Sequence, residues 1–311
     1  MRAWCTNWRK AYSAQEGWSS DSTDLFFFRW DNGVVSYAQF PKYFEIYGKK
    51  EPQTLNHVPT TFAYGHPELS YYEMIGMDPE KMKAFMKAMA PLEAKMPIAG
   101  IYDFGWLVEK ARDPSAAERP VFVDVGGGKG TAIKAIHDEF PELPLDRFVL
   151  QDRPEVVAAV KELDDPVLRK VTPMVVDFHE AQPLKGTVQP RLSSHSTCIL
   201  ELTRNLLGAL VYWIRRCLHN YGDDVSINML RKIAESMADD SKLLIEEDVL
   251  DNPPNHMAAM LDLLMLGFGG KQRNLETWEK VIAAAGLRIT GISKGKGPWK
   301  SLSVIECAKA T

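Results

Sequence analysis

The chain has 311 residues, of which 45% are hydrophobic and 25% are charged, and this is enough to bury the cores of about two domains. Its formal net charge of −4 and its pI near 6.0 exclude the strong positive field expected of a protein that binds nucleic acid or an anionic membrane. These values favour chemistry on small molecules.

The cysteines and the apolar segments indicate the cellular compartment of the protein. The four cysteines are too scattered for a disulfide framework or a CxxC metal site; they are Cys5, Cys198, Cys217 and Cys307. The first residues, MRAWCTNWRK, lack the apolar core of a signal peptide, and the longest apolar stretch, residues 257–270, is too short to span a bilayer. We therefore expect a soluble, cytoplasmic protein without a membrane anchor.

A polar, proline-bounded segment at residues 111–120, ARDPSAAERP, separates two parts of different character. The first part, residues 1–115, is rich in helix formers, aromatic residues and methionine. In the second part, residues 116–311, the apolar runs VFVDV, RFVLQ, TPMVV, ALVYWI and KLLIEE alternate with helix-like segments such as TAIKAIHDEF and PEVVAAVKEL. Repeated strand and helix units predict a doubly wound, parallel α/β sheet with helices on both faces.

Glycine-rich or titratable residues follow five successive predicted strands. They are residues 126–130, Asp152, Asp177, His219 and Glu247. Parallel sheets bind their ligands outside the carboxyl ends of the strands, where these residues would meet. We therefore predict the active site at that edge of the sheet.

The glycine-rich loop after the first of these strands has the pattern GxGxG, at Gly126, Gly128 and Gly130. Such a loop turns sharply and lets a ligand approach the backbone and the following helix N-terminus. The nicotinamide fingerprint GxGxxG would need glycine where Thr131 stands. Asp152 could hold both hydroxyls of a ribose, or it could merely cap the next helix. The combination predicts a nucleotide-type cofactor, either NAD or S-adenosylmethionine.

A series of ordered motifs resembles the small-molecule O-methyltransferases that methylate plant caffeate-type phenols and fungal polyketides. The motifs are VDVGGGKGT, FVLQDRPEVV, VVDF, RRCLHNYGDD, LLIEEDVL and MLDLLMLGFGGKQRN. Their sequences most resemble those of fungal enzymes of secondary metabolism. The resemblance runs from about residue 25 to the C-terminus with one interruption. It implies a Rossmann-like methyltransferase sheet, S-adenosylmethionine as the cofactor and a small aromatic acceptor.

The resemblance also assigns the residues that hold the cofactor. In this family the glycine loop holds the methionine end, the acid after the second strand holds the ribose, and an acid with its neighbour flanks the adenine. A cation four residues before the family histidine lies at the cofactor, and here it is an arginine instead of the usual lysine. The implied cofactor-binding residues are Gly126, Gly128, Gly130, Asp152, Asp177, Phe178 and Arg215.

Methyl transfer from a sulfonium is an in-line displacement, so the acceptor oxygen must be deprotonated and aligned. A phenol titrates near pH 10, which calls for a base such as histidine. The resemblance places His219 as that base, and Glu247 could hold its other ring nitrogen. The structural alternative is that His219 caps a strand and that Glu247 is a solvated neighbour of Glu246. The reaction needs no metal.

Two further sets of residues complete the predicted site. The family's second glutamate, in GGKERT, is Gln272 here, and an amide can form hydrogen bonds but contributes no negative charge. This change predicts reduced activity or an unusually acidic acceptor. Met265, Asp262 and Met89 are predicted to line the acceptor pocket, although methionines at helical spacing more often belong to a core.

Two departures concern the organisation of the chain. Family members carry a longer, winged-helix-type N-terminal region that builds a dimer; here it is truncated, so we expect a weakened homodimer, and residues 1–24 read as a disordered or misassigned start. Residues 187–208 lack periodicity and interrupt a connection that is normally short. Our hypothesis is that they are a retained in-frame intron, which sequencing of the transcript would test.

These observations favour an S-adenosylmethionine-dependent O-methyltransferase acting on a phenolic or enolic hydroxyl of a small aromatic, polyketide-like metabolite. A second interpretation keeps the fold and the cofactor but has no methyl transfer, either through loss of catalysis or through another reaction such as a pericyclic step. Gln272, the truncation and the interruption favour it, whereas His219 and Glu247 oppose it. An NAD-dependent oxidoreductase is disfavoured by Thr131 and by the lack of a hydride-site motif.

Overall fold

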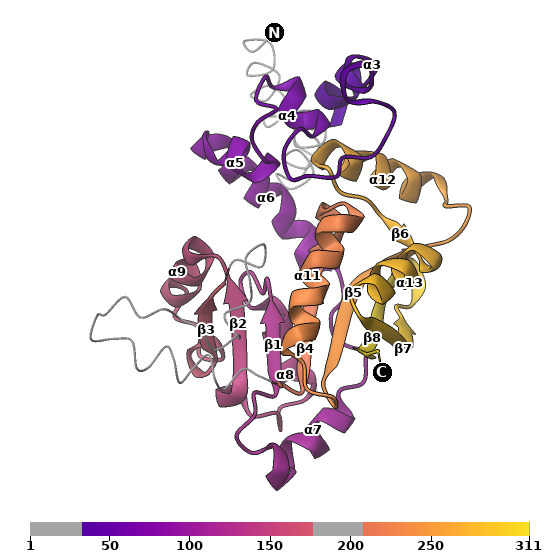
Figure 1. The fold of residues 1–311 in the computed structure, drawn as a ribbon. Helices are drawn as coiled ribbons and strands as arrows, with labels where there is room; N and C mark the ends of the chain where they lie inside the picture. The colour runs from indigo at the N-terminus through magenta and orange to yellow at the C-terminus, as the bar shows by residue number, and fades with distance from the viewer. Residues whose placement is uncertain (1–32, 177–207, 311) are drawn as a thin grey trace, which may run out of the picture. The chain divides into compact units, whose positions relative to one another are not determined.

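The computed structural model describes residues 33–176 and 208–310 (Figure 1). The chain divides into two compact units, each of which combines segments that are distant in sequence. The first takes the described residues of Met1–Met96, Asn220–Gly222 and His256–Lys271, and the second takes those of Pro97–His219, Asp223–Asn255 and Gln272–Thr311. The predicted boundary between residues 115 and 116 is a linear division of the sequence, and it stays a prediction.

The first unit is helical. Its helices are α3 (Val35–Tyr47), α4 (Pro59–Ala63), α5 (Tyr71–Gly76), α6 (Pro79–Lys95) and α12 (His256–Phe268). Helix α5 begins with a capping box: the Ser70 hydroxyl accepts the Glu73 N–H at 3.3 Å, and the Glu73 carboxylate accepts the Ser70 N–H at 2.8 Å. Helix α12 can approach α4 closely because a Cβ at Gly267 would already lie 3.2 Å from Thr60 Oγ1. The helical character predicted for the N-terminal region is confirmed.

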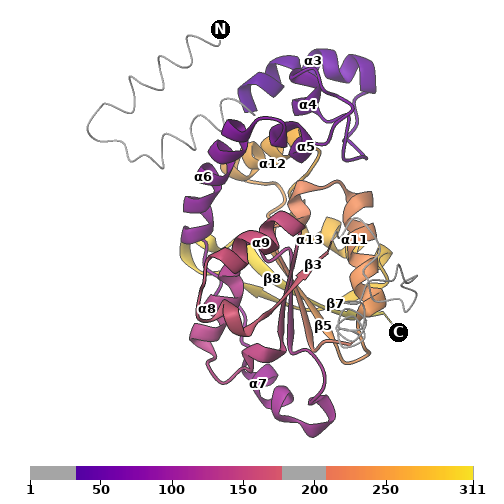
Figure 2. The ribbon, with the colours of Figure 1, turned by 90° about the vertical axis from the view of Figure 1, so that its left-hand side faces the viewer.

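The second unit contains an eight-stranded sheet within its described residues, in the order β3-β2-β1-β4-β5-β8-β7 with β6 paired to β5 (Figures 1 and 2). The strands are β1 (Phe122–Val125), β2 (Phe148–Asp152), β3 (Thr172–Val175), β4 (Val211–Arg215), β5 (Lys242–Leu250), β6 (Arg273–Asn274), β7 (Leu287–Lys294) and β8 (Leu302–Lys309). Strands β1 to β6 pair in parallel, whereas β8 runs antiparallel to both β5 and β7. The predicted parallel sheet is confirmed, with an antiparallel pair added at one side.

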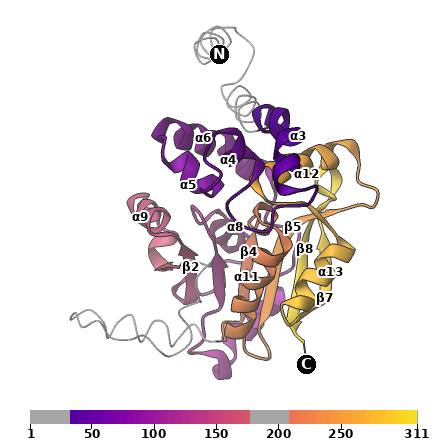
Figure 3. The ribbon, with the colours of Figure 1, turned by 45° about the horizontal axis from the view of Figure 1, so that its top comes forward.

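Helices cover both faces of this sheet, as a doubly wound fold requires. They are α7 (Gly105–Arg112), α8 (Thr131–Glu139), α9 (Pro154–Glu162), α11 (Asp223–Ser236) and α13 (Leu275–Ala284). Figure 2 shows α8 and α11 on opposite faces, and Figure 3 shows α11 beside α13, which it contacts. The expected alternation of strands and helices is therefore present.

The centre of the second unit is an aromatic core. Phe122 of β1 and Phe148 of β2 are register partners, and their rings stack with centroids 5.1 Å apart. Phe104 and Trp213 each pack on Phe122 with ring centroids 6.1 Å apart. All residues of β1 and β2 are buried, which is typical of parallel strands covered on both faces. The glycine loop follows directly after β1, and Asp152 is the last residue of β2.

Several predictions fall outside the described residues: Asp177, Phe178, the segment 1–24 and the interruption at 187–208 apart from Gly208. Their structural consequences therefore stay predictions. Within residues 33–176 and 208–310, no helix combines the length and the apolar character that crossing a membrane would require.

Candidate active site

The glycine-rich loop follows β1 and has backbone torsions that favour glycine. Gly126, Gly128 and Gly130 have φ angles of 72°, 54° and 69°, in the left-handed region. A Cβ at Gly127 would lie 2.8 Å from the Asp124 carboxyl carbon, and a Cβ at Gly130 would lie 2.5 Å from Leu168 Cδ2. The loop thus forms a close-fitting cradle that ends at the N-terminus of α8, a position that suits a ligand approaching the backbone.

Asp152, at the end of β2, is directed toward this loop. Its Oδ2 accepts the Gly128 N–H and its Oδ1 accepts the Arg153 N–H, each at 2.8 Å. Burial raises the pKa of Asp152, while the two backbone N–H groups oppose that rise. The alternative that Asp152 caps α9 is wrong, because Arg153 is the N-cap residue and no side chain caps that helix. Each carboxylate oxygen retains acceptor capacity for a ribose hydroxyl.

A cluster of buried charges lies beneath the loop. Asp124 is 1% exposed, and its Oδ2 has no hydrogen-bond partner in the described part of the chain. Burial raises its pKa to about 7, helped by Asp152 and Glu246 and opposed by Arg215. Arg215, predicted to lie at the cofactor, forms an ion pair with Glu246 (Nε to Oε2, 2.9 Å). A buried carboxyl oxygen without a partner, next to a glycine cradle, fits a ligand that carries a positive charge.

The predicted base and its predicted partner meet. His219 lies in a short 3-10 helix (Leu218–Asn220) after β4, and its Nδ1 is 2.7 Å from Glu247 Oε2 on β5. Glu247 Oε1 also accepts the backbone N–H of His219 at 3.3 Å. Glu247 is only 1% exposed and His219 8%, so the alternative of a solvated Glu247 is wrong. The two bonds hold the imidazole at the carboxyl end of β4, next to β1 and its loop.

The electrostatics of this pair define the state of the imidazole. Burial alone would raise the pKa of Glu247, but the hydrogen bonds from His219 and the charge of Arg216 hold it well below its usual value. Burial lowers the pKa of His219, and the Glu247 carboxylate opposes this. Glu247 is therefore ionised and His219 neutral at pH 7. Because Nδ1 must then carry the proton that Glu247 accepts, Nε2 is left as a basic acceptor.

Two arginines that sequence reasoning missed support the base. Arg216 has a φ of 50° and forms ion pairs from Nη1 to Asp248 Oδ2 (2.7 Å) and to Glu247 Oε2 (3.5 Å). Arg273, which is 1% exposed, donates to the Leu218 carbonyl at 3.1 Å and to Asp223 at 2.8 Å. It thereby anchors the turn that carries His219. The only sequence signals were the arginine pair before LHNYGDD and the arginine after Gln272, and both resemble surface charges.

The remaining predicted residues have these positions. Gln272 is 7% exposed and precedes β6 in the second unit. Met89 on α6 and both Asp262 and Met265 on α12 are partly buried and belong to the first unit. Their roles toward the acceptor stay predictions.

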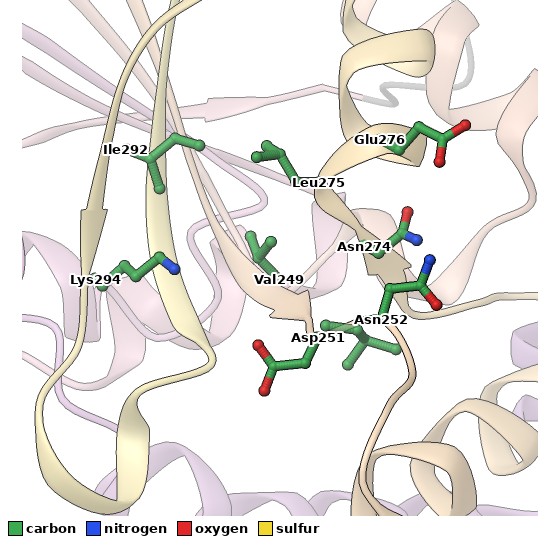
Figure 4. A pocket seen from close by; sticks show the side chains of 9 residues that line it. Val249, Asp251, Asn252, Asn274, Leu275, Glu276, Ile292 and Lys294 are labelled. Atoms are coloured by element: carbon green, nitrogen blue, oxygen red, sulfur yellow. The ribbon is translucent and has the colours of Figure 1, made fainter.

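A surface cleft on the second unit contains none of the predicted site residues (Figure 4). It is lined by Val249, Leu250, Asp251, Asn252, Asn274, Leu275, Glu276, Ile292 and Lys294. The Asn274 side chain already caps α13 by accepting the Thr277 N–H at 3.0 Å. None of the residues predicted to carry the chemistry therefore lines this cleft. In the described residues no group of three or more His, Cys, Asp or Glu could hold a metal ion.

Comparison with known families identifies the chain. The O-methyltransferase domain family matches residues 50–186 and 201–288, so the chain belongs to this family. The unmatched residues 187–200 lie within the predicted interruption. A related protein, methyltransferase cfoD of Aspergillus candidus, is 38% identical over 287 residues, which is 90% of this chain and 64% of the relative. The chain thus spans less than two thirds of that relative's length.

Solved structures show the same fold. The LepI complex with S-adenosylmethionine (SAM) has a TM-score of 0.73 at 19% identity, covering 92% of this chain and 67% of that chain. A structure described as a pericyclic reaction enzyme has a TM-score of 0.71 at 18% identity, with coverage of 92% and 67%. The predicted family and the Rossmann-like fold class are confirmed.

Proposed function

Starting from its membership of the O-methyltransferase domain family, we propose that this chain transfers a methyl group from S-adenosylmethionine to an acidic hydroxyl of a small molecule. The observation that carries the proposal is the buried pair of His219 Nδ1 and Glu247 Oε2, 2.7 Å apart. A neutral imidazole held in this way presents a base at the edge of the sheet where the glycine loop lies.

The cofactor is S-adenosylmethionine, as the similarity to the LepI complex supports and the residues of the loop allow. Asp152 retains acceptor capacity for the ribose, and the unpartnered Oδ2 of Asp124 suits the ammonium of a methionine end. The glycine cradle from Gly126 to Gly130 gives the backbone close access to this ligand. Asp177 and Phe178 would flank the adenine. When bound, the cofactor supplies an electrophilic methyl group on a sulfonium.

His219 moves the proton. Its Nε2 accepts the proton of the acceptor hydroxyl, and the oxygen that remains becomes the nucleophile. The Glu247 carboxylate holds Nδ1–H and stabilises the imidazolium that forms, as the carboxylate does in a hydrolytic triad. The imidazolium then returns its proton to solvent, which restores the base. This arrangement favours phenolic or enolic hydroxyls, since their protons are acidic enough for an imidazole to remove.

The experiment uses S-adenosylmethionine with a labelled methyl group and a panel of polyphenols and enols. We expect labelled product from the wild-type chain and a loss of at least a hundredfold in His219→Ala, because general bases contribute about 10²–10⁴ in rate. His66→Ala, at a partly exposed histidine of the first unit, is the matched control. Calorimetric titration should show that both variants still bind S-adenosylmethionine and that none binds NAD. Equal label transfer by wild type and His219→Ala would refute the assigned base.

A second candidate is a protein of the same fold that binds the cofactor without transferring its methyl. The likeness to a pericyclic reaction enzyme and the amide at Gln272 favour it. In that case the chain binds S-adenosylmethionine, no panel member gains label, and a substrate is converted into an isomer of unchanged mass. The NMR shift of the labelled methyl carbon also separates O-methyl products from N- or C-methyl products.

The cellular setting is part of the proposal. We propose a cytoplasmic enzyme of fungal secondary metabolism whose acceptor is an aromatic, polyketide-like metabolite. Met265, Asp262 and Met89 are proposed to contact that acceptor, and a homodimer is proposed as the assembly. Size-exclusion chromatography with light scattering tests the assembly directly.

A further inference from the structure

Arg216 connects the carboxylate that holds the base to a second carboxylate. Its Nη1 lies 2.7 Å from Asp248 Oδ2 and 3.5 Å from Glu247 Oε2. The other oxygen of Asp248 accepts the Ser301 hydroxyl at 2.8 Å. Glu247 Oε2 is the same atom that contacts His219 Nδ1 at 2.7 Å. A continuous chain of contacts therefore runs from Ser301 through Asp248, Arg216 and Glu247 to His219.

The backbone at Arg216 is unusual and directs the side chain into this network. Its φ of 50° lies in the left-handed region, which residues with a side chain rarely adopt. Its N–H still donates to the Glu246 carbonyl at 3.0 Å, so the residue is anchored on β5 despite the unfavourable torsion. Strained backbone persists only where surrounding contacts over-determine it, and the two carboxylates provide such contacts here.

The charges near His219 within the described residues of the second unit come from several segments. Glu247 and Asp248, both on β5, favour the imidazolium, whereas Arg216 disfavours it. Cys217, next to Arg216, is held as a neutral thiol because burial, and then Glu247 and Asp152, raise its pKa. The turn that carries His219 also meets the buried guanidinium of Arg273, which donates to the Leu218 carbonyl and is paired with Asp223. Among residues 33–176 and 208–310, Arg216 is thus the arginine in ion-pair contact with Glu247.

We propose that Arg216 is a positioning residue for the base: its guanidinium ties Glu247 to Asp248 and keeps Glu247 ionised and aligned, so that Nε2 of His219 stays free to accept a proton. The kinetic part of this proposal rests on the proposed methyl transfer, whereas its structural part does not. The Arg216 guanidinium also neutralises part of the negative charge of Glu247. Glu247 therefore stabilises the imidazolium less, and Nε2 of His219 is less readily protonated.

The first test measures the protonation of His219 by NMR, in the protein without substrate and with histidine side chains labelled. The chain has seven histidines, and the spectrum of His219→Gln identifies the resonance of interest. We expect Arg216→Met to move the titration midpoint of His219 upward by about half a unit to one unit, because removing a nearby positive charge favours the imidazolium. Arg216→Lys keeps the charge and should leave the midpoint close to that of wild type.

Arg216→Gly separates the effect of Arg216 on the titration of His219 from its effect on folding. Glycine relieves the left-handed torsion while removing the guanidinium, so this variant should melt closer to wild type than Arg216→Met does and still show the upward shift of the His219 midpoint. Arg169→Met is the matched control, since Arg169 is an exposed arginine of the same unit that pairs with Asp164 at 3.5 Å. It should change neither the midpoint nor the melting temperature.

The second test is the pH profile of methyl transfer. In Arg216→Met we expect the acid limb of kcat/KM to move to higher pH by the same amount, with kcat reduced about tenfold at all pH values through loss of alignment. Arg216→Lys should recover the position of the limb but only part of kcat, because a lysine cannot bridge two carboxylates with a planar fork.

A His219 midpoint that is unchanged in both Arg216→Met and Arg216→Gly overturns the proposal, as does an equal shift in Arg169→Met. These outcomes differ from a failure of the proposed function. If the wild-type chain transfers no methyl group, the NMR titration still decides whether Arg216 controls His219.

Discussion

The glycine loop and the proposed base, His219, lie at the ends of two neighbouring strands, β1 and β4, yet they are constructed differently. The loop is one contiguous run, Gly126–Gly130, and its shape requires residues without a Cβ. The base is assembled from separated positions, with His219 supported by Glu247, Arg216 and Arg273. A motif made by local backbone geometry is visible in sequence, whereas a motif made by charge partners becomes complete only in the folded chain.

Glu247→Gln tests the carboxylate partner of His219 and should have the largest effect on activity. An amide can still contact His219 Nδ1, but it cannot stabilise an imidazolium and can select the wrong tautomer, so we expect kcat to fall about 10²- to 10⁴-fold. Stopped assays with labelled donor measure the loss, and calorimetry should show unchanged cofactor affinity. Glu276→Gln, at an exposed glutamate that pairs with Lys280, is the control. A loss below tenfold in Glu247→Gln would contradict the view that the proposed base, unlike the glycine loop, depends on its charged partners.

Gly130→Ala tests the fit of the glycine-rich loop. The new Cβ would meet Leu168 at 2.5 Å in a backbone of φ 69°, so we expect the free energy of unfolding to fall by roughly 2–4 kcal/mol and the cofactor affinity to fall at least tenfold. Gly286→Ala has a φ of 79° and meets nothing within 4 Å, so it should cost only about 1 kcal/mol and leave affinity unchanged. Urea denaturation and calorimetry measure both. Identical behaviour of the two variants would contradict the close fit of the loop.

Asp124→Asn should change the pH dependence of stability. The pKa of the folded Asp124 carboxyl is about 7, above its ordinary value of 3.8, so the folded state binds this proton more tightly than the unfolded state. Its contribution is therefore present below about pH 4 and is lost as pH rises toward 7. Asp124→Asn should be more stable than wild type at pH 8, on the order of 2–3 kcal/mol, and not at pH 4.

Urea denaturation at pH 4 and pH 8 measures this difference, with the exposed Asp138→Asn as the control. The same variant should bind S-adenosylmethionine about tenfold more weakly, because an amide offers the ammonium no negative charge. A wild-type stability difference between the two pH values that persists in Asp124→Asn would show that other groups cause it.

Lys294→Ala should have the smallest effect. Lys294 lines the surface cleft on the second unit, which contains none of the predicted site residues (Figure 4). We expect kcat/KM and the cofactor affinity to stay within about twofold of wild type, since substitutions of exposed side chains are usually close to neutral. A tenfold loss in the labelled-donor assay would instead place part of the chemistry in this cleft.

The sequence by itself determined the parallel sheet and the glycine loop, and through the family resemblance it suggested His219 with Glu247 as a possible partner, which the structure then showed to be in contact. Alternating apolar runs predicted the strands, and the pattern GxGxG predicted positions whose φ angles are indeed positive. These features depend on local rules or on the common carboxyl edge of parallel strands, so one chain is enough to recognise them.

Only the tertiary structure decided which charges surround the base and which units the helices join. Nothing in the sequence singled out Arg216 or Arg273, yet one bridges Glu247 to Asp248 and the other is buried and donates to the turn of His219. Likewise α12 belongs to the first unit although it follows β5. The reason is physical: burial and ion pairing depend on groups that are far apart along the chain, and no local pattern records which of them will meet.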